Sequence, residues 1–335
     1  MTSTNNTASY TNEYGYFNLK PDARTANWFL VSNPLYTLGI CLSYVYIVKL
    51  LGPKLMENRK PFQLKNALVY YNLFQVLFST WLFYEIGMGG WFTGDYSIRC
   101  QPVDYSNNPT TIRMVHASWW YFFSKFTEFF DTIFFVLRKK FDHINTLHVI
   151  HHGIMPMSVW FGVKYCPGGH STFFGLLNTF VHIVMYFYYF LTALGPQVQK
   201  YLWWKKYLTG FQMVQFVAIM VHAFQLFFTD CNYPKVFALW IGSHAVLFFF
   251  LFKDFYLRTY RRRKAATQNG KANGVSNGKL QNGTAFQNGQ SNGTAKQNGQ
   301  SNGAVKPNGV IKDASEYYVN GIQSATELHQ RFKQQ

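Results

Sequence analysis

The sequence predicts an all-α protein that crosses a membrane several times. Of its 335 residues, 48% are hydrophobic and 20% are aromatic, far more than in an ordinary soluble domain. Seven apolar segments are each long enough to approach or cross a hydrocarbon core of about 30 Å. They cover residues 34–52, 66–86, 115–136, 147–163, 171–194, 207–228 and 235–257. The chain therefore divides into an N-terminal segment (1–27), a membrane domain of seven transmembrane helices (28–264) and a polar tail (265–335).

Basic residues follow every second apolar segment, and this pattern sets the orientation. The clusters are Lys54, Arg59, Lys60 and Lys65; Arg138, Lys139 and Lys140; Lys200, Lys205 and Lys206; and Arg258, Arg261, Arg262, Arg263 and Lys264. Because short basic connections stay in the cytosol, the N-terminus is predicted to be luminal and the tail cytosolic. The same pattern accounts for the net charge of +17, so no nucleic-acid partner is expected.

Two cysteines and one glycosylation sequon fall on the predicted luminal side. A disulfide would persist there, and we favour a Cys100–Cys231 bridge over two unrelated thiols. The cysteines of the chain lack metal-ligand spacing. Asn5 begins an Asn-Asn-Thr sequon, which agrees with a luminal N-terminus.

Charged residues enter the membrane domain in the third apolar segment. Lys125, Glu128 and Asp131 recur at helical spacing together with Thr132, and all lie on one side of the predicted helix. An unpaired charge in hydrocarbon costs several kcal/mol, so Lys125 is expected to pair with a carboxylate or to face a wet cavity. An ion pair that only orders the helix bundle is the alternative.

The fourth segment carries a cluster of histidines. His148, His151 and His152 cover about a third of the helix circumference, so all three face the same neighbour. Pro156 cannot donate to the carbonyl of His152, and a kink is expected beside the cluster. The segment is short, and a broken helix is an open possibility here.

Polar stripes continue on the fifth and sixth segments. They consist of Asn178, His182, Tyr186 and Tyr189 on the fifth segment and Thr209, Gln212 and Gln215 on the sixth. Each stripe needs hydrogen-bond partners in hydrocarbon, and one shared cavity is the simplest solution for all four helices. The more isolated Glu85, His116, His222 and His244 are assigned no chemistry.

The HxxHH pattern also occurs in membrane di-iron desaturases and hydroxylases. Those sites need about eight or more imidazole-rich ligands in several histidine boxes, and this chain has one such box, so we expect no metal. The tail repeats Asn-Gly pairs without apolar strands beside them, and we expect it to be disordered. Its last five residues, Arg331 to Gln335, resemble a dilysine-type retrieval signal of endoplasmic reticulum membrane proteins.

Four motifs in order resemble the signature boxes of the ELO family, the elongases of very long chain fatty acids. They begin at Lys125 (KFTEFFDT), His148 (HVIHH), His182 (HIVMYFYY) and Thr209 (TGFQMVQ), and the resemblance covers about residues 25–262. The stretch 194–209 further resembles the animal members that act mainly on saturated and monounsaturated chains. The resemblance implies seven transmembrane helices, six of them around a narrow tunnel. It also implies condensation of a long-chain acyl-CoA with malonyl-CoA in the endoplasmic reticulum.

The resemblance and the chemistry of the residues together suggest roles for the polar stripes. His151 would attack the acyl-CoA thioester, and His182, supported by Asn178, would polarise the malonyl thioester carbonyl. His148 and His152 would orient the nucleophile. The remaining polar side chains of the cavity would contact substrate: Lys125, Glu128, Asp131, Tyr186, Tyr189, Gln212 and Gln215.

The basic connections suit the phosphates of CoA. Lys139, Lys140, Lys205 and Lys206 are candidates for this contact, although the same residues also satisfy the topology rule. The expected partners are acyl-CoA, malonyl-CoA, the lipid bilayer and other enzymes of the elongation cycle, without a cofactor. A di-iron desaturase or hydroxylase and a seven-helix receptor or transporter are the competing classes.

Overall fold

The structure, a computed structural model, describes residues 20–261, and these residues form helices without any β-strand. The α-helices are α1 (Pro34–Tyr46), α2 (Gly52–Met56), α3 (Lys65–Ile86), α4 (Pro109–Thr127), α5 (Phe129–Leu137), α6 (Thr146–Tyr165), α7 (Thr172–Leu194), α8 (Pro196–Gln199), α9 (Lys205–Phe224) and α10 (Lys235–Tyr256). Short π-helical or 3-10 turns extend or connect them: η1 (Ile47–Leu51), η2 (Gly87–Trp91), η3 (Phe141–His143), η4 (Gly169–Ser171), η5 (Gln225–Phe227) and η6 (Leu257–Arg261). The all-α prediction is confirmed for this part of the chain. The Asn5 sequon, the tail and its retrieval signal lie outside the described residues.

Asparagine side chains mark the start of three helices. Asn33 accepts a hydrogen bond from the backbone of α1, and Asn108 accepts one from Thr111 in α4. Proline occupies the first helical position in both cases, where its missing N–H has no cost. Asn145 accepts from the backbone N–H of His148 at 2.9 Å. The third cap therefore starts α6 directly in front of the histidine cluster.

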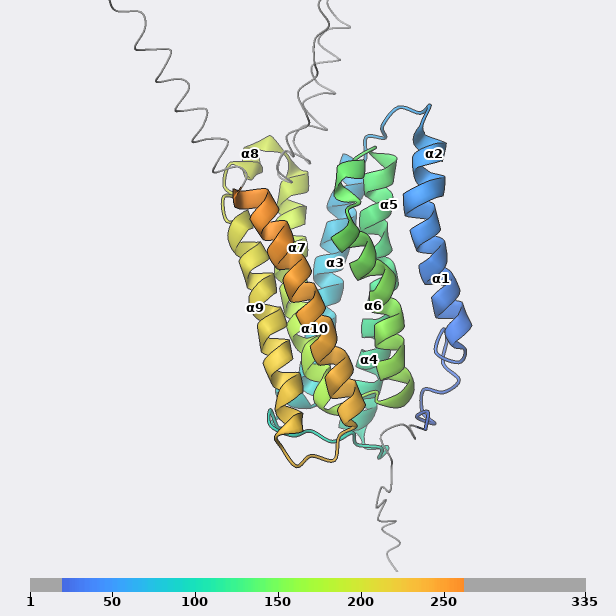
Figure 1. The fold of residues 1–335 in the computed structure, drawn as a ribbon, viewed down its shortest axis with the longest axis vertical. Coiled ribbons are helices and arrows are strands. Elements are labelled where there is room, and N and C mark those ends of the chain that lie inside the picture. The colour runs from blue at the N-terminus through green and yellow to red at the C-terminus, as the bar shows by residue number, and fades with distance from the viewer. Residues whose placement is uncertain (1–19, 262–335) are drawn as a thin grey trace, which may run out of the picture.

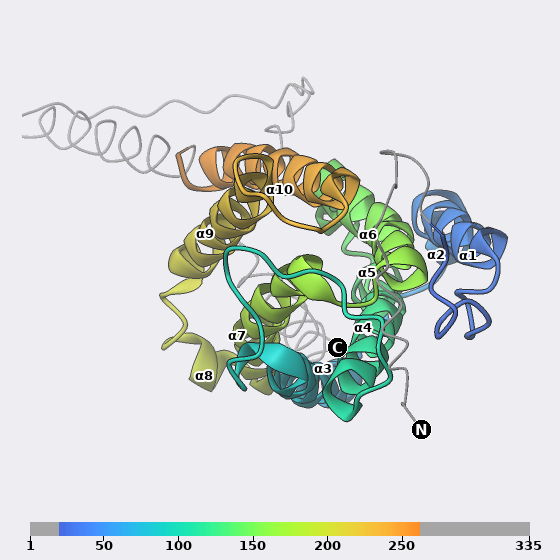
Figure 2. The same cartoon turned by 90° about the horizontal axis from the view of Figure 1, so that it is seen from below.

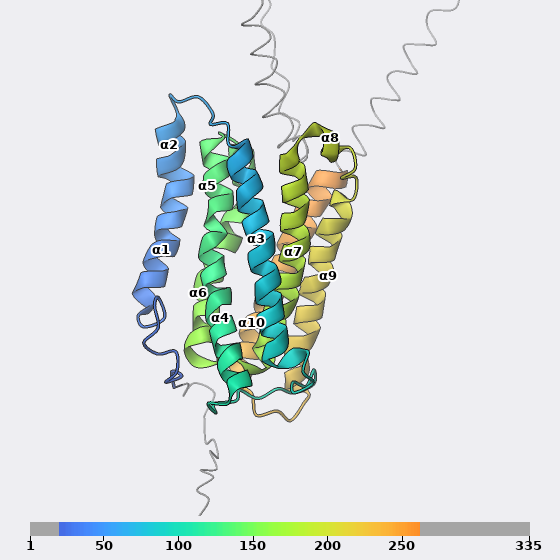
Figure 3. The ribbon, with the colours of Figure 1, turned by 180° about the vertical axis from the view of Figure 1, so that it is seen from behind.

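The long helices run side by side along the longest axis of the molecule (Figures 1 and 3). Among the described residues, six rods close a ring in the order α3, α4–α5, α6, α10, α9 and α7, with α7 returning to α3 (Figure 2). The rod of α1 and α2 lies outside the ring, where α1 packs against α6 and α2 against α5. This ring agrees with the arrangement that the family resemblance implies.

Four stretches within residues 20–261 are long and apolar enough to cross a membrane. They are Pro34–Met56, Gly169–Leu194, Lys205–Phe227 and Lys235–Thr259. The other three predicted segments also form helices, namely α3, α4–α5 and α6. Their composition is more polar because they hold buried groups such as Gln75, Lys125 and His152.

The third predicted segment is broken at Glu128, which the sequence analysis did not anticipate. Ser124 Oγ donates to the carbonyl of Tyr121, and Thr127 Oγ1 donates to the carbonyl of Ser124, both at 2.7 Å. Side-chain bonds of this kind compete with the helix ladder and bend helices. By contrast, α6 continues as one helix through Pro156.

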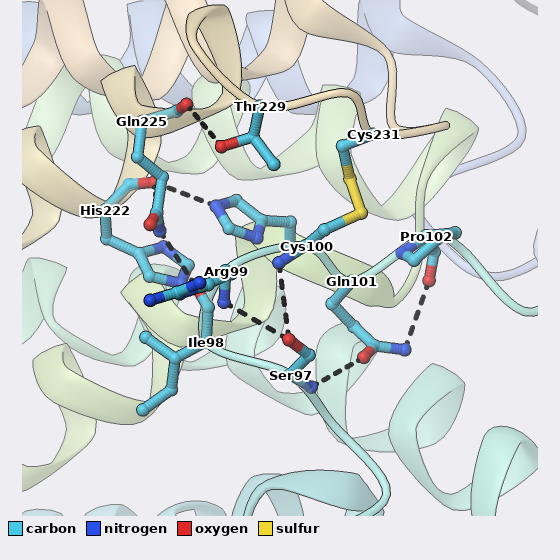
Figure 4. The surroundings of a disulfide bond; sticks show 11 residues. Ser97, Ile98, Arg99, Cys100, Gln101, Pro102, His222, Gln225, Thr229 and Cys231 are labelled. Atoms are coloured by element: carbon cyan, nitrogen blue, oxygen red, sulfur yellow. Dashed lines mark hydrogen bonds between the residues drawn. A yellow bond between two sulfur atoms is a disulfide. The ribbon is translucent and has the colours of Figure 1, made fainter.

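The connections gather at two ends of the bundle. Residues 57–64, 138–145 and 195–204 lie at the end that holds α8, here called the basic end (Figures 1 and 3). At the opposite end, Cys100 and Cys231 form a disulfide with a Cα–Cα distance of 5.6 Å (Figure 4). The Gln225 side chain also donates to the carbonyl of Ile98 at 2.8 Å. This second end is called the disulfide end.

Candidate active site

The centre of the candidate site is a buried lysine on α4. Lys125 Nζ lies 2.6 Å from Glu128 Oε1 and donates to Asn178 Oδ1 at 3.0 Å. It also lies 4.5 Å from the centre of the Tyr121 ring. The two charged side chains are only 2% and 4% exposed. Lys125 thus pairs with a carboxylate, the first of the two environments expected for it, and the additional contacts offset the cost of burying its charge.

Asn178 and His182, one turn apart on α7, extend this cluster. Asn178 Oδ1 accepts from Lys125 and from the Tyr121 hydroxyl, the latter at 2.8 Å. The amide nitrogen of Asn178 therefore faces His182 Nε2, 3.3 Å away, and donates to it. His182 Nδ1 lies 3.3 Å from Glu128 Oε1, so Nδ1 carries the ring proton. His182 Nε2 is therefore an acceptor in this arrangement, which does not fit the donor role expected for it.

A second hydrogen-bonded chain holds the histidines of α6. His148 Nε2 lies 2.8 Å from Thr132 Oγ1, which lies 2.8 Å from the Tyr44 hydroxyl. The rings of His148 and His152 are 4.4 Å apart. Within residues 20–261, no group of three or more His, Cys, Asp or Glu side chains is placed to hold a metal ion. The hydrogen bond to Thr132 fixes the ring of His148.

His151 on α6 has an imidazole nitrogen that makes no hydrogen bond within the described residues. Its Nδ1 atom is buried and has no hydrogen-bond partner among the described residues, and the same holds for Nδ1 of His152. The His151 ring lies 4.7 Å from Phe248 of α10. Glu128 and Lys125 are close enough to interact with it electrostatically. An unbonded imidazole nitrogen near a charged cluster is available to react.

A third set of contacts joins α5, α7 and α3. The Tyr186 hydroxyl donates to Asp131 Oδ2 at 2.8 Å. Beside them, Gln75 Nε2 donates to the Tyr71 hydroxyl at 3.0 Å, and this hydroxyl donates to the carbonyl of Thr127 at 3.2 Å. Asp131 and Tyr186, each predicted to contact substrate, are therefore bonded to one another, and Tyr71 of α3 lies beside them with its ring 6.2 Å from that of Tyr186.

The sequence analysis missed several residues of the site, all of them uncharged. They are Tyr44, Tyr71, Gln75 and Tyr121. A signal for α3 was present, because Asn72, Gln75 and Ser79 follow helical spacing and are buried. No sequence pattern marked the three tyrosines, because each of them forms its hydrogen bond with a residue of another helix.

Other predicted residues lie at the margin of the site. Gln212 Nε2 donates to Met185 Sδ at 3.3 Å, and Gln215 on the same helix is buried. The Tyr189 ring lies 6.1 Å from the Tyr186 ring. The contact of Gln212 places α9 against Met185 of α7, beside the polar stripe.

Lys139 at the basic end makes contacts within the protein. Its Nζ donates to the carbonyls of Glu57 and Arg59 at 3.0 and 3.1 Å. Lys139 itself has a positive φ of 55°, a conformation that is uncommon outside glycine. The side chain therefore joins the end of α5 to the end of α2.

The other lysines predicted to contact phosphate are Lys140, which lies close to His143 in the chain, and Lys205 and Lys206 at the start of α9. Burial, followed by the charge of Lys205 and then by other basic groups that include Lys140, lowers the pKa of His143 to about 3. Lys206 is exposed, and its Nζ lies 4.7 Å from the centre of the Tyr207 ring. These side chains concentrate positive charge at the basic end.

A cavity leads from the polar cluster toward the disulfide end. Its volume is about 70 Å³, and its walls come from α3, α4, α6, α7 and α10. The wall residues include Tyr121, Val159, Val163, Phe174, Phe237 and Ile241. An apolar cavity below a group of converging polar side chains has the character of a ligand site.

The sequence of this chain places it in one family of membrane enzymes. The chain matches the GNS1/SUR4 family, also called ELO, over residues 29–268, and it belongs to this family. It is 70% identical over 263 residues to a very long chain fatty acid elongase of Aedes aegypti, which covers 77% of this chain and 72% of the relative. It is also similar to very long chain fatty acid elongase 7 of Drosophila melanogaster, at 63% identity over 78% of this chain and 80% of the relative. The protein of the same name from Rattus norvegicus is 58% identical over 72% of this chain and 86% of the relative.

Proposed function

We propose that this chain condenses a long-chain acyl-CoA with malonyl-CoA to give 3-oxoacyl-CoA, CoA and carbon dioxide. The observation that carries the proposal is the cluster of Lys125, Asn178 and His182 at one end of an apolar cavity, in a chain closely similar to fatty acid elongases. The polar cluster suits the reacting thioesters, and the cavity suits the acyl chain.

His151 is the proposed nucleophile. Its unbonded Nδ1 attacks the thioester carbonyl, a carbon–nitrogen bond forms, and the carbon–sulfur bond breaks. CoA leaves as a thiolate and takes up the proton that the imidazole releases. Glu128, which interacts electrostatically with His151, stabilises the positive charge that develops on the ring. His148 and His152 orient the ring from the neighbouring positions on α6.

Malonyl-CoA reacts in the second step. Loss of carbon dioxide moves negative charge onto the oxygen of the malonyl thioester. The second N–H of Asn178, the one that His182 does not accept, donates to this oxygen. The carbanion then attacks the acyl carbonyl, a carbon–carbon bond forms, and the bond to His151 breaks. The positive charge of Lys125 nearby favours the anionic intermediate.

The proposed enzyme spans the membrane of the endoplasmic reticulum seven times. Family membership and the four apolar stretches support a multispanning protein, and α3, α4–α5 and α6 lie in the same ring. The basic end is cytosolic in this proposal, with the N-terminus in the lumen. Substrate CoA would then meet Lys140, Lys205 and Lys206, whereas Lys139 joins α5 to α2. The two CoA esters supply all reacting atoms, so the proposed reaction uses no cofactor. The proposed partners are these esters, the bilayer and other enzymes of the elongation cycle.

A labelling experiment tests the reaction class. Membranes that contain the chain are incubated with a panel of acyl-CoA esters and with malonyl-CoA labelled either at C2 or at the free carboxyl group. The C2 label is expected in the 3-oxoacyl product, and the carboxyl label is expected as carbon dioxide. Failure with every acyl-CoA would favour a receptor or transporter. Stoichiometric iron in the purified protein would favour a desaturase or hydroxylase.

A further inference from the structure

A second, smaller cavity lies beyond the first at the disulfide end, and we call it the end chamber. Its volume is about 10 Å³, which is room for one group the size of a water molecule. The two cavities share Ser171, Phe174 and Ile241 in their walls. The first cavity reaches Tyr121, whose hydroxyl is bonded to Asn178, and an acyl chain that passes the shared wall would follow a path from the active site into the end chamber.

Two buried histidines give the end chamber a polar wall. His170 Nε2 is 2.8 Å from the carbonyl of His222, so it must donate, and Nδ1 is left as an acceptor. This Nδ1 and Nε2 of His222 have no hydrogen-bond partner among the described residues. The side chains are only 2% and 7% exposed, and their rings stack at 3.8 Å. The sequence analysis assigned no chemistry to His222, which lies close to the disulfide (Figure 4).

The two cavities therefore present different chemistry to the end of an acyl chain. The first is enclosed by side chains such as Val159, Phe174 and Phe237, where a hydroxyl group would lose its hydrogen bonds to water. In the end chamber, a hydroxyl could bond to either unpartnered imidazole nitrogen, since it both donates and accepts. A methyl group would fill the same space and leave these nitrogens unsatisfied.

We propose that the end chamber is a recognition site for a terminal hydroxyl group. An ω-hydroxyacyl chain whose end reaches the chamber is then a better substrate than the methyl-ended chain of equal length. Shorter ω-hydroxyacyl chains end in the first cavity and are poorer substrates. The inference rests on the proposed condensation reaction. The path is long enough for this distinction, because Ser171 precedes His182 by eleven residues, about 16 Å along a helix axis.

Competition between paired substrates tests this inference in the wild-type enzyme. Each acyl-CoA from decanoyl to docosanoyl is mixed with its ω-hydroxy counterpart, and the elongation rate of the ω-hydroxyacyl chain is divided by that of the methyl-ended chain. We expect a ratio below one for short chains and a rise to about three- to tenfold above one at the length that reaches the chamber. A ratio that stays below one at every length overturns the inference while the methyl-ended products still support the proposed function. If none of the substrates is elongated, both the inference and the proposed function are contradicted.

Variants locate the effect in the end chamber. His222→Phe keeps a ring stacked on His170 and removes the His222 nitrogens. Tyr233→Phe removes a wall hydroxyl that is also buried without a hydrogen-bond partner among the described residues and could bond to the same ligand group. Each is expected to reduce the ratio for long chains toward one, with little change for short chains. The matched control His116→Phe replaces an exposed histidine beside Trp28 and should leave the ratio unchanged. An unchanged ratio in both chamber variants would contradict the inference. Tyr233→Phe decides the question if His222→Phe does not fold.

Discussion

Asn178 links Lys125 and Tyr121 to His182. Its oxygen accepts from Lys125 and Tyr121, and its nitrogen donates to His182. The neighbours therefore fix the orientation of the amide. An aspartate at this position would keep an oxygen that accepts from Lys125 and Tyr121, but it would lose the N–H group that donates to His182.

The variant Asn178→Asp separates the two proposed half-reactions. We expect acyl transfer to His151 to continue, because this step does not use the amide nitrogen. Carbon dioxide release from malonyl-CoA should fall by about a hundredfold or more, since the donor to the developing oxyanion is absent. Mass spectrometry of the intact protein measures the first step, and release of labelled carbon dioxide measures the second. Equal loss of both steps would contradict the assigned role.

The variant His151→Ala tests the nucleophile directly. With acyl-CoA alone, the wild-type protein is expected to gain the mass of the acyl group, and the variant is expected to gain none. Product formation should fall by about a thousandfold or more, because the proposed carrier of the acyl group is removed. His116→Ala, a change at an exposed histidine, should behave like the wild type. Accumulation of an acyl-enzyme in His151→Ala would assign the nucleophile to another residue.

At the scale of elements, the junction of α4 and α5 concentrates the charge of the site. Lys125 lies in the last turn of α4, and Glu128 is the residue between α4 and α5. Their ion pair therefore spans the junction of the two helices. Breaking a buried pair leaves one charge uncompensated. The junction therefore depends on both partners.

Single substitutions at the junction should destabilise the protein strongly. Lys125→Met and Glu128→Gln are each expected to lower the free energy of unfolding by about 3–5 kcal/mol. Tryptophan fluorescence during thermal or denaturant unfolding in detergent provides the measurement. Arg258→Gln is the control, because the Arg258–Asp254 pair is exposed by 65% and 55% and should contribute less than about 1 kcal/mol. Similar unfolding midpoints for all three variants would refute this account.

The sequence predicted the helices better than it predicted their junctions. Apolar runs and helical spacing located the rods, and the spacing of Lys125 and Glu128 placed them correctly on one face. The break at Glu128 depends on hydroxyl contacts of Ser124 and Thr127, which compete with the helix ladder only in a particular rotamer. The role of Tyr44 depends on Thr132 in another rod, so no local pattern could reveal it.

At the scale of the whole molecule, the disulfide joins two distant connections. Cys100 and Cys231 are 131 positions apart in the chain. Closing such a long loop restricts the unfolded chain. The bridge thereby holds the two connections that close the disulfide end.

Removing the disulfide should lower stability without removing the active-site residues. The double variant Cys100→Ser/Cys231→Ser is expected to lose about 2–5 kcal/mol of unfolding free energy. Reductant should lower the unfolding midpoint of the wild type toward that of the variant and leave the variant unchanged. A wild-type midpoint that does not respond to full reduction would show that the bridge adds no stability.

The uneven polarity of the rods has a consequence for biosynthesis. In the proposed topology, the rod of α1 and α2 is apolar enough to enter the membrane as soon as it is synthesised. The rod of α4 and α5 emerges later with the Lys125–Glu128 pair, whose further partners Asn178 and His182 lie on α7 and have not yet been translated. We therefore expect the polar rods to complete their contacts only after α7 has been synthesised.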